Sequence, residues 1–251
     1  MSTHPLVLLH AFPLDARMWE GLSARLSGDG IRLITPDQRG LGQAKLPDAG
    51  REPDLDDAAA DVVALLDRLE LDRVVLGGCS MGGYVSMAVL RAAPERVAGV
   101  VLIDTKASAD TDDARDTRLS TASRALAEGH HGWLADNLLP SLVGPTTEAE
   151  RPEVGTRVRE LIEAQPSEGI AWALRAMAAR PDSFELLRST RVPALVVHGE
   201  EDRLTGVDEA EAMADALPQG QLAVVPRAGH LSPMEDPDAV AEAIGAAVRG
   251  W

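Results

Sequence analysis

The strongest candidate for chemistry is Ser80, which lies at the centre of a Gly-x-Ser-x-Gly pattern at residues 78–82. The pattern follows a short apolar run, Val74–Gly77, and precedes a helical stretch, and this context makes it informative. The turn between such a strand and helix is so tight that Gly78 and Gly82 must lack side chains. It pushes the serine hydroxyl out of the sheet, at the positive end of a helix. The sequence therefore predicts Ser80 as a nucleophile.

Ser80 needs a base, because a serine hydroxyl is a poor nucleophile until its proton is removed. Among the six histidines, His230 lies just after the last predicted strand, where loops at the carboxyl edge of a parallel sheet converge. His198 lies within or at the end of a strand and is expected to be structural. His130 and His131 fall in a helical region and are expected to be solvated. We therefore predict His230 as the base.

The base in turn needs a carboxylate that fixes its tautomer and stabilises the imidazolium ion. Asp202 follows the predicted strand 194–198, so it should reach the same edge of the sheet. Glu200 and Glu201 compete with it by residue type, and Asp104, after an earlier strand, is a second candidate. We predict Asp202 as the acid and keep Asp104 as the alternative.

Attack on a carbonyl also requires backbone N–H groups that face the developing oxyanion. Met81, directly after the serine, would supply one of them. The loop 10–15 after the first strand should supply the other, and Phe12 is the predicted donor. His10, which ends that strand, is expected either to shape the loop by hydrogen bonding or to be an ordinary polar residue.

A parallel sheet would bring these residues together, and short apolar runs do alternate with helical stretches along the chain. Several runs are continuously apolar, as expected for strands buried on both faces. The predicted strands are Leu6–His10, Arg32–Pro36, Val74–Gly77, Val97–Ile103, Ala194–His198 and Leu222–Val225. The predicted helices of this part are Ala16–Leu26, Asp54–Leu69, Met81–Ala93 and Asp238–Val248.

The alternation stops between Lys106 and Arg191, where no convincing strand is found. A structureless loop of that length would be implausible in a compact domain. We therefore predict a core formed by residues 1–105 and 192–251, with residues 106–191 as an inserted helical cap. The predicted helices of the cap are Asp113–Ala127, Gly132–Leu142, Glu153–Ala164, Ser167–Ala179 and Phe184–Ser189.

The composition is that of an ordinary globular protein, with 45% hydrophobic and 25% charged residues among 251. The net charge of −16 disfavours nucleic acid and anionic membranes as partners, because both attract basic surfaces. No apolar run approaches the ~20 residues of a membrane span, and no secretory signal is visible near Met1. The single Cys79 cannot form an internal disulfide, and we expect a cytoplasmic location. No oligomeric state is predicted.

The chain resembles the α/β-hydrolase superfamily over nearly its whole length. It has, in family order, the loop 10–15, Asp37–Gly42 after the second strand, the turn 78–82, Asp202 and His230. The sequences His-Ala-Phe-Pro-Leu-Asp and Cys-Ser-Met-Gly-Gly-Tyr are most similar to those of small enol-lactone and ester hydrolases such as 3-oxoadipate enol-lactonase. The resemblance implies a three-layer α/β core of about six mainly parallel strands, a helical cap over the catalytic edge, and no metal or cofactor. Many relatives begin with an antiparallel hairpin that this chain is expected to lack.

Residues and resemblance together predict a serine hydrolase that cleaves a carboxylic ester or lactone of a small acyl substrate through an acyl-enzyme. Carbon–carbon bond hydrolysis or cofactor-free peroxidation on the same triad is one alternative, and a non-catalytic ligand receptor is another. Trp133 and Trp172 are the predicted substrate-pocket residues. Leu134, Leu138 and Met177 are further candidates from the cap, although helical spacing also suits packing within the cap.

Overall fold

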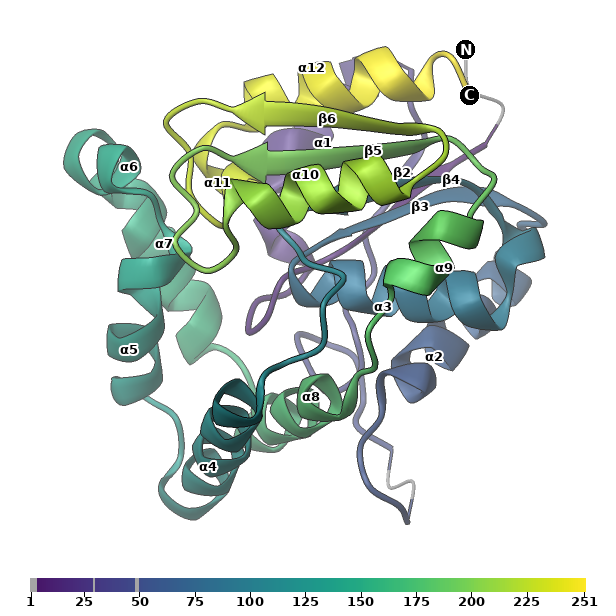
Figure 1. The fold of residues 1–251 in the computed structure, drawn as a ribbon. Coiled ribbons are helices and arrows are strands. Elements are labelled where there is room, and N and C mark those ends of the chain that lie inside the picture. Colours follow the sequence, from purple (N-terminus) through teal and green to yellow (C-terminus); the bar gives the residue numbers. More distant parts are fainter. Residues whose placement is uncertain (1–3, 29, 48–49) are drawn as a thin grey trace.

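The computed structural model describes residues 4–28, 30–47 and 50–251, which contain one six-stranded sheet (Figure 1). The strands follow the order β2-β1-β3-β4-β5-β6, and every neighbouring pair is parallel. The predicted sheet of six parallel strands is confirmed. The strands are β1 Leu6–Leu9, β2 Leu33–Ile34, β3 Val74–Cys79, β4 Val97–Ile103, β5 Ala194–Gly199 and β6 Gly220–Val225.

The central strands are apolar because both of their faces are covered. Every residue of β1, β3 and β5 is buried. The register of the sheet then sets where the strands end, since Leu9 pairs with Gly78 and Gly78 pairs with Leu102. The segments that follow β1, β3 and β4 therefore leave the same edge of the sheet side by side.

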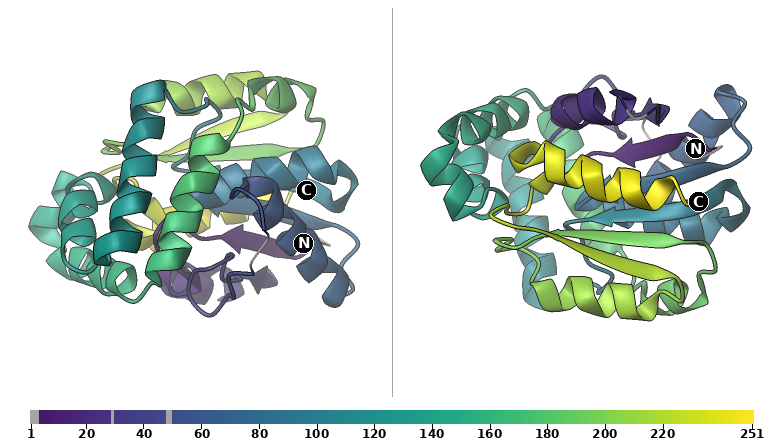
Figure 2. Two further views of the ribbon diagram at one scale, coloured as in Figure 1. Left: turned by 90° about the horizontal axis from the view of Figure 1, so that it is seen from below. Right: turned by 90° about the horizontal axis from the view of Figure 1, so that it is seen from above.

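A layer of helices covers each face of the sheet (Figures 1 and 2). The elements of these layers are η1 Ala16–Trp19, α1 Glu20–Gly28, α2 Leu55–Arg68, α3 Met81–Ala92, η2 Pro94–Arg96, α9 Phe184–Ser189, α10 Val207–Ala216, α11 Ser232–Glu235 and α12 Pro237–Val248. On one face α12 packs on α1, β5 and β6; on the other, α3 packs on α2 and the central strands, and α10 packs on α9 and β5. The core helices that were predicted are present, with the first divided between η1 and α1.

Only helices lie between β4 and β5, a stretch that the structure describes completely. Besides α9 they are α4 Asp112–Glu128, α5 Trp133–Leu142, α6 Pro145–Glu150, α7 Pro152–Glu163 and α8 Ser167–Ala179. Helix α4 packs against α8, and α7 packs against α5 and α6. Figure 2 shows α4–α8 gathered beyond the ends to which the strand arrows point. The helices predicted in this stretch are confirmed, and α6 was not predicted. The division of the chain into a core and a cap at residues 106 and 191 stays a prediction.

None of the helices in the described part of the chain combines the length and the apolar character needed to cross a membrane.

Candidate active site

Ser80 occupies the turn between β3 and α3, where its backbone φ is 52°. A positive φ is unfavourable for a residue with a side chain and persists only where the surrounding structure imposes it. A Cβ on Gly78 would lie 2.3 Å from the backbone of Gly82, and a Cβ on Gly82 would lie 2.0 Å from the carbonyl oxygen of Leu9. Neither position accepts a side chain, as predicted, although Gly82 is restricted by β1 rather than by Gly78.

Three side chains from separate loops form one hydrogen-bonded chain at this edge. His230 Nε2 lies 2.8 Å from Ser80 Oγ, and His230 Nδ1 lies 2.8 Å from Asp202 Oδ2. The side chains of His230 and Asp202 are only 3% and 0% exposed. An ionised carboxylate can only accept hydrogen bonds, so Nδ1 carries the proton and Nε2 offers its lone pair to the serine hydroxyl. This geometry suits a serine nucleophile with histidine as its base.

The groups around Asp202 favour its ionised form. Burial acts to raise its pKa, but the neighbouring His230 and hydrogen bonds from His230 and Thr205 outweigh burial and lower the pKa of Asp202. Its Oδ1 accepts the N–H groups of Leu204 and Thr205 at 2.8 and 3.1 Å, and its Oδ2 accepts the hydroxyl of Thr205. The carboxylate is therefore both charged and fixed in its orientation toward the imidazole.

The glutamates that precede Asp202 bind other partners. Glu200 accepts the N–H of Arg227, and Glu201 accepts the N–H and hydroxyl of Thr146. Both side chains thus bind residues other than the imidazole of His230.

Asp104, the alternative acid, is fully buried and binds the backbone around the site. Its Oδ1 accepts the N–H of Gly199 at 2.8 Å, and its Oδ2 accepts the N–H and hydroxyl of Ser232 at 3.0 and 2.6 Å. Gly199 lies at the start of the loop that carries Asp202, and Ser232 lies just after His230. Burial and the nearby charge of Asp202 raise the pKa of Asp104 well above its usual range. Asp104 ties two loops together and does not bind the imidazole.

The backbone N–H groups of Phe12 and Met81 donate no hydrogen bond to another described residue. Met81 is the first residue of α3, where N–H groups have no partner inside the helix. The loop that carries Phe12 is held by His10, whose Nε2 accepts the N–H of Gln38 at 2.9 Å and whose carbonyl accepts the Gln38 side chain at 2.7 Å. The predicted role of His10 in shaping this loop is confirmed. Phe12 and Met81 as oxyanion donors stay a prediction.

A cavity of about 450 Å³ opens at Ser80 and His230. Its volume is typical of sites for small molecules. Phe12 and Thr205 line it on the core side, and α4, α5 and α8 supply the opposite wall. The large apolar side chains of that wall are Leu134, Leu138, Leu142, Leu174 and Met177.

Comparison with known families agrees with this architecture. The sequence matches the alpha/beta hydrolase fold family over residues 4–237. The chain belongs to this family. The predicted superfamily is therefore confirmed.

Individual relatives of this α/β-hydrolase differ in their activities. The structure of a thermophilic esterase from Thermogutta terrifontis with malate bound is 40% identical, with a TM-score of 0.94 over 99% of this chain and 90% of the esterase. The 3-oxoadipate enol-lactonase 1 of Acinetobacter baylyi is 25% identical over 93% of this chain and 84% of its own. The non-heme chloroperoxidase of Streptomyces lividans is 32% identical over 88% of this chain and 87% of the chloroperoxidase. The chain also spans 63% of the dihydrolipoyllysine-residue acetyltransferase component of an acetoin cleaving system from Pseudomonas putida, with 32% identity over 98% of this chain. The resemblance to enol-lactonases is thus confirmed.

Contrary to prediction, the structure places Trp133 and Trp172 outside the lining of the α/β-hydrolase cavity. The guanidinium carbon of Arg124 lies 4.1 Å from the centre of the Trp133 ring. The guanidinium carbon of Arg39 lies 5.6 Å from the centre of the Trp172 ring. Successive residues of an α-helix point in different directions, so Leu134 faces the cavity while its neighbour Trp133 does not. Of the other cap candidates, Leu138 and Met177 do line the cavity.

One end of the cavity carries basic groups that the sequence pattern did not reveal. Lys106 and Arg118 line it around the buried carboxylate of Asp110, and Asp113 lies at its exposed rim. Arg118 Nε and Arg180 Nη2 donate to Asp110 at 2.6 and 2.8 Å, and Lys106 Nζ lies 3.8 Å away. Burial opposes ionisation of Asp110, but the bonds from Arg180 and Arg118 lower its pKa to about 2. Three cations around one buried carboxylate leave this end positively charged.

Glu235 is another residue that was missed, and it braces the loop of His230. It is buried, and its Oε2 accepts the N–H groups of Gly144 and Gly229, each at 2.9 Å. Its Oε1 accepts the N–H of Leu231 at 3.1 Å. A lone glutamate carries no sequence signal for such a role, because the pairing with Gly144 joins residues 91 positions apart.

Among the described residues, no histidine other than His230 lines the cavity at Ser80. His198 is buried in β5, consistent with the structural role predicted. His130 is buried rather than solvated, whereas the side chain of His131 is 72% exposed. Among the described residues, the groups with potential metal ligands within 4.8 Å of one another are His130, His131 and Glu163, and Asp104, His198 and Asp202. In the second group both carboxylates already accept the hydrogen bonds that position the site.

We expect Asp202→Asn to lower turnover by up to about 10⁴-fold, because an amide cannot fix the imidazole tautomer or stabilise the imidazolium ion. Asp104→Asn should lower turnover far less and destabilise the fold by about 1–3 kcal/mol, since one buried donor loses its acceptor. Turnover and urea unfolding of both variants test this. A large loss of turnover in Asp104→Asn together with a near-normal rate in Asp202→Asn would identify Asp104, after β4, as the acid.

Leu138→Phe should shift the preference toward shorter acyl chains, because the larger side chain fills part of the cavity. Trp172→Ala, outside the cavity, should keep the ranking of the parent protein. The ratio kcat/KM for p-nitrophenyl esters of increasing chain length measures both. An unchanged ranking in Leu138→Phe together with a changed ranking in Trp172→Ala would contradict the lining described above.

Proposed function

We propose that this α/β-hydrolase is a serine hydrolase that cleaves carboxylic esters or lactones through an acyl-enzyme. The observation that carries the proposal is the hydrogen-bonded chain from Asp202 through His230 to Ser80, which opens into the 450 Å³ cavity. The similarity to an esterase and to an enol-lactonase supports the same reaction class.

The reaction follows from the positions of these groups. Ser80 Oγ attacks the carbonyl carbon while His230 Nε2 takes its proton, and Asp202 stabilises the resulting imidazolium ion. The oxyanion accepts hydrogen bonds from the N–H groups of Phe12 and Met81. Collapse of this intermediate breaks the ester bond, and His230 returns the proton to the leaving alcohol. Water then attacks the acyl-enzyme in the same way and releases the acid and Ser80.

Ser80→Ala should lower turnover of p-nitrophenyl acetate by about 10⁴-fold or more, because the members of a triad act as a unit. Its circular dichroism spectrum and Tm should match those of the parent, since only one hydroxyl is lost. A fluorophosphonate probe should label the parent protein at Ser80 and leave the variant unlabelled. Parent-level turnover in purified Ser80→Ala would exclude this mechanism, and labelling without turnover of any ester or lactone would favour a ligand receptor.

The basic end of the cavity favours substrates that carry a carboxylate. In the described part of the chain, neither the Lys106 ammonium nor the Tyr84 hydroxyl makes a hydrogen bond, and both residues line the cavity. Arg118 Nη1 contacts the sulfur of Met177 at 3.6 Å. Burial, together with the nearby Arg180, lowers the pKa of Lys106, and a bound anion would raise it again. Lys106 and Arg118 pair with Asp110 but keep further N–H groups that can donate to the acceptor oxygens of a carboxylate. The similar esterase has malate, a dicarboxylate, bound.

We expect mono-p-nitrophenyl glutarate to be cleaved with a higher kcat/KM than neutral p-nitrophenyl butyrate. Lys106→Met and Arg118→Met should each lower kcat/KM for the anionic ester by about 10-fold or more, the worth of a hydrogen bond to a charged group. Their kcat/KM for the neutral ester should stay within a few-fold of the parent. Arg124→Met, in the same helix as Arg118 but outside the cavity, is the control. Equal losses on both esters would leave the hydrolase proposal standing and contradict the carboxylate preference.

Similarity to a non-heme chloroperoxidase favours one second candidate, cofactor-free peroxidation on the same triad. Hydrogen peroxide would replace water in the attack on the acyl-enzyme and release a peracid instead of an acid. Peracid formation from an ester and hydrogen peroxide, measured beside hydrolysis of the same ester, decides between them. A peracid yield no greater than that of Ser80→Ala would exclude the second candidate.

A further inference from the structure

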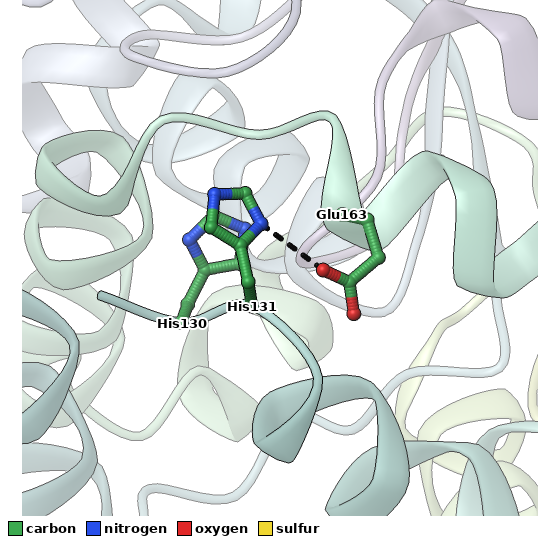
Figure 3. A group of neighbouring side chains, drawn as sticks. All are labelled: His130, His131 and Glu163. Atoms are coloured by element: carbon green, nitrogen blue, oxygen red, sulfur yellow. Dashed lines mark hydrogen bonds and ion pairs between the residues drawn. The ribbon is translucent and has the colours of Figure 1, made fainter. Parts of the chain in front are cut away.

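Outside the cavity, two histidines and a glutamate meet on the far side of the predicted cap. His130 and His131 lie in the turn between α4 and α5, and Glu163 is the last residue of α7. One potential ligand atom from each lies within 4.8 Å of the others. The centroids of the two imidazoles lie 4.2 Å apart with their planes tilted by 40°, and Figure 3 shows each ring with a nitrogen on the side that faces the carboxylate. None of the three lines the cavity at Ser80.

His130 is 1% exposed, and the backbone of Ile162 and Glu163 lies near its ring. Its Nδ1 lies 2.9 Å from Ser167 Oγ, while its Nε2 is buried without a hydrogen-bond partner among the described residues. A buried polar atom without a partner costs about 1–3 kcal/mol. When Nδ1–H donates to Ser167, Nε2 carries the lone pair that a metal ion requires. In metal-binding histidines, a hydrogen bond from the ring nitrogen that does not bind the metal commonly fixes the orientation of the imidazole.

The other two side chains are also held in place. Glu163 Oε1 accepts the N–H of Gly132 at 2.9 Å, and its Oε2 lies 3.0 Å from His131 Nδ1. The side chain of His131 is 72% exposed and that of Glu163 is 28% exposed, so solvent reaches the group from one side. A net charge of −16 over the whole chain adds a general attraction for cations.

We propose that His130, His131 and Glu163 bind one divalent transition-metal ion, with Zn²⁺ favoured, as a site that joins two parts of the cap. Two imidazoles and one carboxylate are a frequent Zn²⁺ donor set, with water in the remaining position. Zn–N bonds are about 2.0–2.1 Å, so ligand atoms on one ion lie no more than about 4.2 Å apart. The exposed imidazole of His131 can supply any movement that brings the three ligand atoms to this separation. The bound ion would connect the α4–α5 turn to the end of α7.

Titration of the EDTA-treated, dialysed full-length protein with ZnCl₂ tests the site by calorimetry. We expect one equivalent to bind with micromolar or tighter affinity and the Tm to rise with zinc concentration, because an ion that binds only the folded state stabilises it. Co²⁺ should bind at the same stoichiometry and give a visible absorption band. Absence of saturable one-to-one binding in the parent protein would overturn the proposal.

Variants of the exposed ligands separate this site from other zinc-binding groups, including the triad. His131→Ala and Glu163→Gln should each abolish one-to-one binding and the zinc-dependent rise in Tm, while their Tm in EDTA shows that they fold. Glu160→Gln is the matched control, since Glu160 lies one turn earlier in α7, is exposed, and pairs with Arg157 at 3.2 Å. Its zinc binding should equal that of the parent. Undiminished one-to-one binding in Glu163→Gln, or an equal loss in Glu160→Gln, would contradict the assignment.

Discussion

The hydrogen-bonded chain from Asp202 through His230 to Ser80 exists only if three loops from distant parts of the sequence are held within bonding distance. A parallel sheet meets this constraint, because the loops at the carboxyl ends of its strands converge at one edge. Gly199 at the end of β5 pairs with Val225 at the end of β6, so the loops that carry Asp202 and His230 begin side by side. The strained turn after β3 then directs the hydroxyl of Ser80 toward the imidazole.

Two buried carboxylates that take no part in this chain hold its loops in place. A carboxylate inside a protein is costly unless hydrogen bonds compensate for the lost water, and Asp104 and Glu235 each accept three. Asp104 joins the loop of Asp202 to that of His230, and Glu235 joins the loop of His230 to the segment after α5. The hydrogen-bond partners of an acidic residue therefore decide whether it orients the imidazole, as Asp202 does, or holds loops together, as Asp104 and Glu235 do.

The predicted cap is attached to the core through the same loop. The N–H of Leu231 donates to the carbonyl of Leu142 at 3.2 Å, so the end of α5 is bonded to the residue after His230. On the inner side, α4 and α8 bring Arg118 and Met177 to the cavity. On the outer side, the turn before α5 meets the end of α7 at His130 and Glu163. The helices of this stretch thus supply both a wall of the cavity and, away from it, the group of His130, His131 and Glu163.

Features with a strong local signal were predictable from the sequence alone. The bounds of β4, α8 and α9 match those predicted, because continuous apolar runs and helical periodicity are properties of neighbouring residues. The pairing of Ser80, His230 and Asp202 was also predictable, since strand order and chain direction place all three at one edge. Only the tertiary structure decided which cap residues face the cavity, excluding Trp133 and Trp172, and which basic side chains surround Asp110. It also decided that His130 is buried. These outcomes depend on how α4, α5, α7 and α8 pack on one another, and such contacts between distant segments leave no periodic pattern in the chain.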